Sequence, residues 1–226
     1  MSGGVSGTFG LTVDSVGSST ISGAIATSTG SVTKTGAGTL TLSAANTYTG
    51  VTQISTGVVM LSGSGRLADT TAVTVDSGAT FDLNDITDTV GSIAGAGSIT
   101  LGSGTLTAGG DASSTTFSGV ISETGGFTKA GAGTLTLTGT NTYSGNTAIA
   151  ASGGSLVIGT AGSLGSGTYA GQVTLGASTT FTYSSSASQT LSGKITGSGA
   201  LTKDTDRKST RLNSSHEWIS RMPSSA

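Results

Sequence analysis

Short runs in which apolar and hydroxyl-bearing residues alternate recur along the whole chain. Each run has Leu, Val or Ile at every second position, with Thr at most of the positions between them. Clear examples lie at residues 39–42, 73–75, 99–101, 105–107, 134–137 and 173–175. A period of two with β-branched residues predicts strands with one buried face, and the Gly, Ser and Asn clusters between the runs predict turns. No segment has helical spacing with start and stop signals, so the sequence predicts an all-β fold.

Two of these runs belong to a long internal repeat. Residues 34–54 read KTGAGTLTLSAANTYTGVTQI and residues 129–149 read KAGAGTLTLTGTNTYSGNTAI, at an offset of 95. A unit of the form T-x-S-G-x-I precedes each copy, at residues 20–25 and 116–121, and occurs again at residues 190–195. The repeat is therefore entered a third time near the end of the chain.

The spacing of the copies predicts the length of one structural turn. Lys34 and Lys129 are 95 residues apart, whereas Lys129 and Lys203 are 74 apart. The second spacing is shorter by 21 residues. A stacked solenoid tolerates an insertion or deletion best when it is one whole turn, so we interpret these 21 residues as the length of one coil. Each long repeat then contains four to five coils.

Coils of this length favour a β-solenoid over a sandwich or a barrel, for which hairpin turns are expected. Stacking places like residues above like at the spacing of about 4.8 Å between strands, and glycine allows tight corners. We predict that residues 1–203 form a parallel β-helix of about nine to ten coils and roughly 45 Å in length. The repeats within it lie near residues 19–114, 115–188 and 189–203.

The composition removes several classes of function. Of 226 residues, 39 are Gly and about 81 are Ser or Thr, while charged residues make up 9% and the net charge is −2. The absence of cysteine excludes a disulfide framework, a thiolate zinc site and a thiol enzyme. The small number of Lys and Arg residues excludes a basic surface for nucleic acid. No run of 18 apolar residues predicts a membrane-spanning helix.

The repeat pattern stops after Lys203. Residues 204–226 contain seven charged residues. They also contain the single His, the single Trp and the single Pro of the chain, which are His216, Trp218 and Pro223. We interpret them as a non-repeat tail that is disordered or artefactual, because RKSTRLNSSHEWISRMPSSA resembles translated vector or adaptor sequence. A native exposed linker and a capping segment are the alternatives.

The repeat units resemble a known family. GAGTLTL, three further residues and NTY-x-G occur at residues 36–50 and 131–145, and FSGVI precedes the second copy at residues 117–121. These units are similar to the autotransporter-associated β-strand repeat of bacterial type V secreted proteins, over most of residues 19–203. The resemblance implies a right-handed parallel β-helix passenger, exported through a C-terminal outer-membrane β-barrel and displayed at the cell surface or released. It also implies that a signal peptide and the barrel lie outside this chain, which is then a passenger fragment.

One cluster of acidic residues has ligands suited to calcium. Its members are Asp82, Asn84, Asp85 and Asp88. The second repeat has Thr182 in place of Asp82 and Ser185 in place of Asp85, and the glycine-rich calcium-binding nonapeptide is absent. We therefore interpret the cluster as a solvated turn and expect no metal site.

The chain offers little for catalysis. Glycoside hydrolysis needs two positioned carboxylates, and Glu123 is the only glutamate before the tail. The sole histidine lies in the tail, so no serine triad is expected, and the G-x-G runs have no following helix to bind phosphate. Lys34, Lys129 and Lys203 recur at equivalent positions, which indicates a structural role. We expect no enzyme activity, no catalytic or cofactor-binding residue and no cofactor.

Two further patterns have both a functional and a structural interpretation. Tyr48 and Tyr143 could stack on sugars, but half-buried packing at a strand end is favoured, with Asn46 and Asn141 bonded to the turn backbone. Paired threonines could form an ice-binding array, which needs them on every coil. They recur here about once in four or five coils, at Thr39, Thr41, Thr134 and Thr136.

These observations together predict a non-catalytic, structural and adhesive stalk segment of an autotransporter passenger. The implied location is the bacterial cell surface, the outer membrane or the extracellular space. The implied partners are the C-terminal β-barrel of the full-length protein and a host or neighbouring cell surface, and no nucleic acid. The alternatives are a fragment of a carbohydrate-active β-helix enzyme and a phage-fibre or surface-layer repeat protein.

Overall fold

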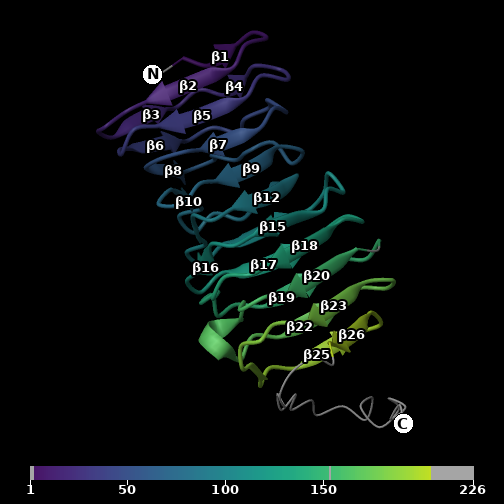
Figure 1. The fold of residues 1–226 in the computed structure, drawn as a ribbon. Coiled ribbons are helices and arrows are strands. Elements are labelled where there is room, and N and C mark those ends of the chain that lie inside the picture. The colour runs from purple at the N-terminus through teal and green to yellow at the C-terminus, as the bar shows by residue number, and fades with distance from the viewer. Residues whose placement is uncertain (1–2, 153, 205–226) are drawn as a thin grey trace, which may run out of the picture.

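The fold is a rod of stacked coils (Figure 1), seen in a computed structural model that describes residues 3–152 and 154–204. The tail predicted at residues 204–226 lies outside the described residues apart from Asp204, and so do His216, Trp218 and Pro223. The first and last strands lie at opposite ends of the rod. Every strand pairing between named strands is parallel, which confirms the predicted all-β solenoid.

Each coil has up to three strand positions, and the first position forms one continuous sheet of ten strands. Its strands, in stacking order, are β2 (Leu11–Asp14), β5 (Val32–Thr35), β7 (Thr52–Ile54), β9 (Ala72–Val75), β12 (Ser92–Gly95), β15 (Thr115–Phe117), β18 (Thr134–Leu137), β20 (Ser155–Ile158), β23 (Thr180–Tyr183) and β26 (Ala200–Lys203). Ten stacked strands correspond to about nine turns, in agreement with the predicted nine to ten coils.

The second position forms a sheet of six strands in the N-terminal part of the rod. These are β3 (Ser19–Ile21), β6 (Thr39–Leu42), β8 (Val58–Leu61), β10 (Thr80–Asp82), β13 (Ser98–Thr100) and β16 (Val120–Ser122). An isolated bridge between Thr140 and Ser163 continues this position, followed by the pair β21 (Thr168–Tyr169) and β24 (Thr190–Leu191). The 3₁₀ turn η1 (Gly165–Gly167) lies just before β21.

The third position is regular in the C-terminal part instead. It begins with the pair β1 (Val5–Ser6) and β4 (Ile25–Ala26), and continues through an isolated bridge between Ala45 and Arg66. A sheet of six strands follows: β11 (Asp88–Val90), β14 (Thr105–Ala108), β17 (Gly126–Lys129), β19 (Thr147–Ile149), β22 (Val173–Leu175) and β25 (Ile195–Gly197).

The coils have the length that the repeat spacing predicted. Hydrogen bonds between neighbouring coils, such as those that join Asn46 to Ile25 and Asp88 to Leu67, each span 21 residues of sequence. The coil that contains η1 is longer, because the bond between Gln189 and Leu164 spans 25 residues.

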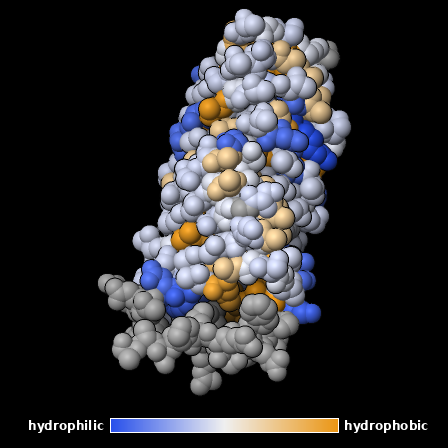
Figure 2. Space-filling model, turned by 90° about the vertical axis from the view of Figure 1, so that its right-hand side faces the viewer, coloured by the Kyte–Doolittle hydropathy of each residue, from blue (hydrophilic) through white to orange (hydrophobic). Residues whose placement is uncertain are grey.

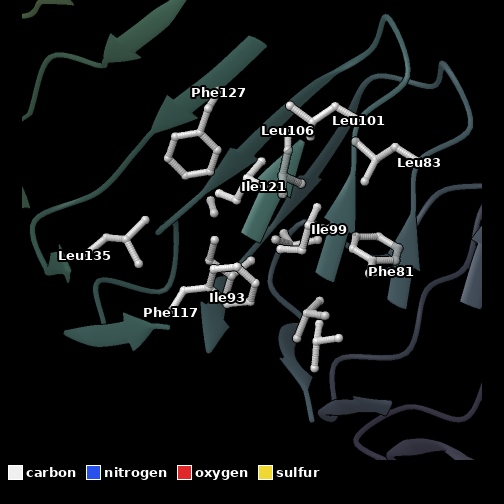
Figure 3. Close-up of a cluster of buried hydrophobic side chains, with 14 of the residues drawn as sticks. Phe81, Leu83, Ile93, Ile99, Leu101, Leu106, Phe117, Ile121, Phe127 and Leu135 are labelled. Atoms are coloured by element: carbon white, nitrogen blue, oxygen red, sulfur yellow. The ribbon is translucent and has the colours of Figure 1, made fainter. Parts of the chain in front are cut away.

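The alternating strand pattern directs one set of side chains into a single narrow core. In β6 and β18, for example, both leucines are buried and both threonines face outward. Figure 3 shows Phe81, Ile93, Ile99, Phe117 and Ile121 from successive coils gathered in the interior. Burial of each such side chain stabilises the fold by roughly 1.5–3 kcal/mol, and in a solenoid the contacts between coils are made with nearest neighbours.

Tight corners require glycine where coils approach each other closely. A Cβ added to Gly119 would overlap the carbonyl oxygen of Gly97 in the preceding coil, so no larger residue fits. Gly36 has a φ of 76° and Gly131 a φ of 64°, a backbone conformation that L side chains rarely adopt. The abundant glycine thus reflects the corners of a closely stacked coil.

The repeats do not superpose on the same strand positions. Lys34 lies in the first position and Lys129 in the third, four full turns and two positions further on. Lys203 is again in the first position, only three turns and one position after Lys129. The prediction that the shortfall between the two repeat spacings is one whole coil is therefore wrong, because the shortfall is one coil and one strand position.

Candidate functional site

The polar residues of the repeated N-T-Y unit lie inside the rod. Asn46 and Asn141 are 5% and 0% exposed. The Oδ1 atom of Asn141 accepts the backbone N–H of Ile121 at 3.0 Å, and its Nδ2 donates to the carbonyls of Gly139 at 3.0 Å and Ser163 at 3.3 Å. Each asparagine therefore links its own coil to the coils before and after it.

Asn46 makes the same contacts in the first repeat. Its Oδ1 accepts the N–H of Ile25 at 2.9 Å, and its Nδ2 donates to the carbonyls of Ala44 at 3.1 Å and Arg66 at 2.7 Å. The predicted hydrogen bonding of Asn46 and Asn141 to the backbone is confirmed, with the addition that it joins neighbouring coils.

Two further residues, whose similarity to the asparagines is not visible in the sequence, continue this arrangement. Asp88 Oδ2 accepts the N–H of Leu67 at 3.1 Å, and Gln189 Oε1 accepts the N–H of Leu164 at 2.7 Å. Each of the four side chains accepts an N–H from an apolar residue one coil earlier. We call these four residues, Asn46, Asp88, Asn141 and Gln189, the polar rungs.

The polar rungs alternate with apolar residues along the rod. In the third position the order is Ile25, Asn46, Leu67, Asp88, and in the second position it is Ile121, Asn141, Leu164, Gln189. Gln189 therefore corresponds to Asp88 in the second repeat. In the sequence these polar residues recur at intervals of two coils. That pattern can be recognised only once the register of the coils is known.

Tyr48 and Tyr143 are completely buried, at 0% exposure, so the interpretation as a sugar-stacking surface is wrong. The two side chains are also more deeply buried than the half-buried packing that we predicted. Tyr48 bonds Thr52 at 2.7 Å through its hydroxyl, and Tyr143 bonds Thr147 at the same distance. Burial raises the pKa of both phenols above the usual value, so the two tyrosines are neutral parts of the core.

The second repeat extends this contact into a small network. Thr147 also bonds the hydroxyl of Tyr169 at 2.8 Å, and that hydroxyl donates to the carbonyl of Gly145. The rings of Tyr143 and Tyr169 meet edge to face with centroids 5.6 Å apart, a favourable arrangement for aromatic rings. Burial raises the pKa of Tyr169 to about 12.

The recurring lysines stabilise corners. Lys34 is 0% exposed and its Nζ donates to the carbonyls of Thr35 and Gly36, each at 2.6 Å. Lys129 is 1% exposed and its Nζ donates to the carbonyls of Ala130 at 2.5 Å and Gly131 at 2.8 Å. Burial lowers the pKa of both lysines, partly offset by Asp14 near Lys34 and Asp111 near Lys129. The predicted structural role of these lysines agrees with this geometry.

The acidic residues of the candidate calcium cluster have separate partners. Asp82 Oδ1 accepts the N–H of Asn84 and the hydroxyl of Thr100, each at 2.9 Å, while Asp85 Oδ1 accepts the N–H of Ser103 at 2.7 Å. Asp88 is buried. Across residues 3–152 and 154–204, no three His, Cys, Asp or Glu side chains gather to hold a metal ion.

The remaining candidates for chemistry are dispersed along the rod. Glu123 is exposed and accepts the N–H of Gly102 at 2.6 Å.

Within the described part of the chain, no helix is long and apolar enough to span a membrane.

Single outward threonines occur on several coils of the ten-stranded sheet. In the first position one register column contains Thr12, Thr33, Gln53 and Thr74, and continues after a break through Thr116, Thr136, Val157, Thr182 and Thr202. The paired threonines of the repeat are a different pattern from this column, to which strands outside the repeat add single threonines. Gln53, Val157 and Ala94, which follows Thr74, interrupt it.

The outer surface is otherwise made of small polar residues. Figure 2 shows one side of the rod as largely pale, with scattered orange and blue residues. Among the described residues, the exposed large apolar side chains are Phe9, Val16 and Val51.

Comparison with known proteins agrees with this architecture. A family described as Passenger-associated-transport-repeat matches residues 32–61 and 127–158, which contain the two similar segments at residues 34–54 and 129–149. The chain is also 42% identical over 89 residues to the adhesin BmaC autotransporter of Brucella suis biovar 1 (strain 1330). The matched part covers 39% of this chain and 2% of that relative. No solved structure matches the chain.

Proposed function

We propose that this chain, whose transport repeats relate it to the passengers of autotransporters, is a non-catalytic stalk segment that carries adhesive surface away from the cell. The observation that supports this most directly is the rod itself. Its coils form about nine stacked turns, and its polar rungs lie inside the structure. Such an arrangement supplies length and stiffness, which are the properties that a stalk needs.

The structure suits a chain that folds after export. Each coil pairs with the coil before it, so folding can proceed by addition of one coil at a time. The polar rungs contribute to the additions in which they occur, because the new side chain accepts a backbone N–H of the preceding coil. The absence of cysteine means that no disulfide closes a loop before the chain has crossed the membrane.

The adhesive role and the cellular location rest on the relative. That protein is described as an adhesin and an autotransporter, and the matched part of the chain corresponds to 2% of its length. In the full-length protein we place the stalk at the bacterial cell surface, joined to a C-terminal outer-membrane β-barrel. The adhesive contact would be made with a host or neighbouring cell.

A display experiment tests both parts of the proposal. The chain is inserted between a signal peptide and the β-barrel of an unrelated autotransporter in a Gram-negative host, and a barrel without passenger is the control. We expect an antibody to an epitope placed at residue 3 to bind intact cells, and adhesion to cultured cells to exceed that of the control. Failure of the epitope to reach the surface would contradict the stalk assignment, whereas surface display without added adhesion would contradict only the adhesive role.

A further inference from the structure

Asp88 occupies a place in the rod that is built for an amide. The other polar rungs, Asn46, Asn141 and Gln189, all accept a backbone N–H and donate an amide N–H to backbone carbonyls. Gln189, the counterpart of Asp88 in the second repeat, donates to the carbonyls of Leu164 at 3.0 Å and Thr190 at 3.1 Å. An ionised carboxylate can accept but cannot donate.

The surroundings of Asp88 favour its neutral form. The side chain is 3% exposed, and burial raises its pKa to about 6 even though the N–H groups of Leu67 and Thr89 favour the charged form. Arg66 on the preceding coil also favours the charged form, while Asp69 opposes it.

Few other ionisable groups face Asp88. The phenol of Tyr48 is neutral, and the nearby Asp88 carboxylate, after burial, contributes to raising its pKa. On the following coil Asp88 lies opposite Leu106, and β14 has no ionisable side chain. Asp85, on the loop before β11, is exposed and bonded to Ser103.

We propose that Asp88 is a proton-sensitive rung of the solenoid. When its carboxyl is neutral it keeps the bond from the Leu67 N–H and gains an O–H donor, the function that the amide N–H provides in the three other polar rungs. When it loses its proton to solvent, the carboxylate retains only the accepting role and the coils are joined less tightly. This inference does not depend on the proposed adhesive function.

The sign of the effect follows from proton linkage. Between the pKa of an unfolded aspartate, near 3.9, and the value of about 6 in the folded rod, the folded state binds more protons than the unfolded state. Stability therefore falls as the pH rises through this window. A difference of about two pKa units corresponds to roughly a hundredfold change in the folding equilibrium constant.

The experiment compares the wild-type chain with its Asp88→Asn and Asp76→Asn variants by thermal unfolding between about pH 3.5 and 7.5. Asp76 is exposed, so its variant controls for the lost charge. We expect the wild type and Asp76→Asn to lose stability together as the pH rises, relative to Asp88→Asn, by up to about a hundredfold in the equilibrium constant. Parallel curves for the wild type and Asp88→Asn would overturn the proposal.

Two further measurements keep the test decisive if Asp88→Asn folds poorly. The first is the titration of the Asp88 carboxyl carbon by NMR in the wild type, where a midpoint well above about 3.9 supports the proposal and an ordinary midpoint overturns it. The second is Asn141→Asp, which places a carboxyl in an equivalent rung. We expect this variant to acquire an additional loss of stability between about pH 4 and 7, and an unchanged pH profile would count against the mechanism.

Discussion

Replacing Asn141 by alanine tests whether the polar rungs hold the coils together. Asn141 is 0% exposed and its side chain is the partner of the Ile121 N–H. The carbonyls of Gly139 and Ser163, which its Nδ2 contacts, each also accept a backbone N–H, from Ser163 and from Asn141 itself. Asn141→Ala therefore leaves one buried N–H without a partner and two carbonyls with one partner fewer.

The cost can be worked out from these contacts. An orphaned buried N–H costs roughly 1–3 kcal/mol, and each of the two lost bonds to a carbonyl that retains a partner costs about 0.5 kcal/mol. We expect a loss of about 2–4 kcal/mol in the free energy of unfolding. For a chain of this size that corresponds to a fall of roughly 5–15 °C in the melting temperature.

Far-UV circular dichroism during thermal and urea unfolding measures this change. The single tryptophan, Trp218, lies outside the described residues. The near-UV absorption of the tyrosines, Tyr143 among them, is therefore used to follow the packing of the core. The matched control is Thr142→Ala, which truncates the exposed neighbouring residue. If Asn141→Ala unfolds within about 0.5 kcal/mol of Thr142→Ala, the idea that the polar rungs stabilise the stacking is wrong.

Two other substitutions probe the corners and the core. Gly119→Ala places a methyl group against the Gly97 carbonyl and should cost at least about 1–3 kcal/mol, whereas Gly110→Ala, whose nearest atom would be 3.8 Å away, should leave the melting temperature unchanged; equal effects of the two on thermal unfolding would refute the close stacking. Tyr143→Phe should cost about 1 kcal/mol, because Thr147 keeps Tyr169 as a partner, and Tyr143→Ala about 3–5 kcal/mol. Urea unfolding separates the two, and a negligible cost for Tyr143→Ala would show that the ring is not part of the core.

The period-two pattern and the repeat spacing were sufficient to predict the architecture. Alternation in runs such as Thr39–Leu42 identifies which side chains are buried, and the recurrence of the repeat unit indicates stacked coils. These features are local or nearly so, and they follow directly from strand geometry.

The sequence could not predict which strand position each repeat occupies. The alternating pattern of a strand is the same in all three positions of a coil. Which position a strand occupies depends on the number of residues in each corner, added up over several coils. This is why Lys34 and Lys129 lie in different sheets.

The environment of individual polar residues also depended on the three-dimensional register. Asp88 resembled a member of a solvated acidic turn because Asp82 and Asp85 are close in sequence. The register instead places it one coil after Leu67, inside the rod. Tyr48 and Tyr143 follow polar residues and precede a turn, and their burial depends on an internal partner, Thr52 or Thr147, four residues later.

The distance between two labelled strands tests the central claim, that the chain is a straight stack of parallel coils. The chain has no cysteine, so Thr33→Cys and Thr182→Cys provide a unique pair of spin labels on outward positions of β5 and β23. These strands are seven steps apart in the ten-stranded sheet, which predicts a separation of about 34 Å at roughly 4.8 Å per step. A narrow distribution near that value by pulsed electron paramagnetic resonance agrees with the rod. A separation below about 25 Å, as a sandwich or a barrel of this length would give, contradicts it.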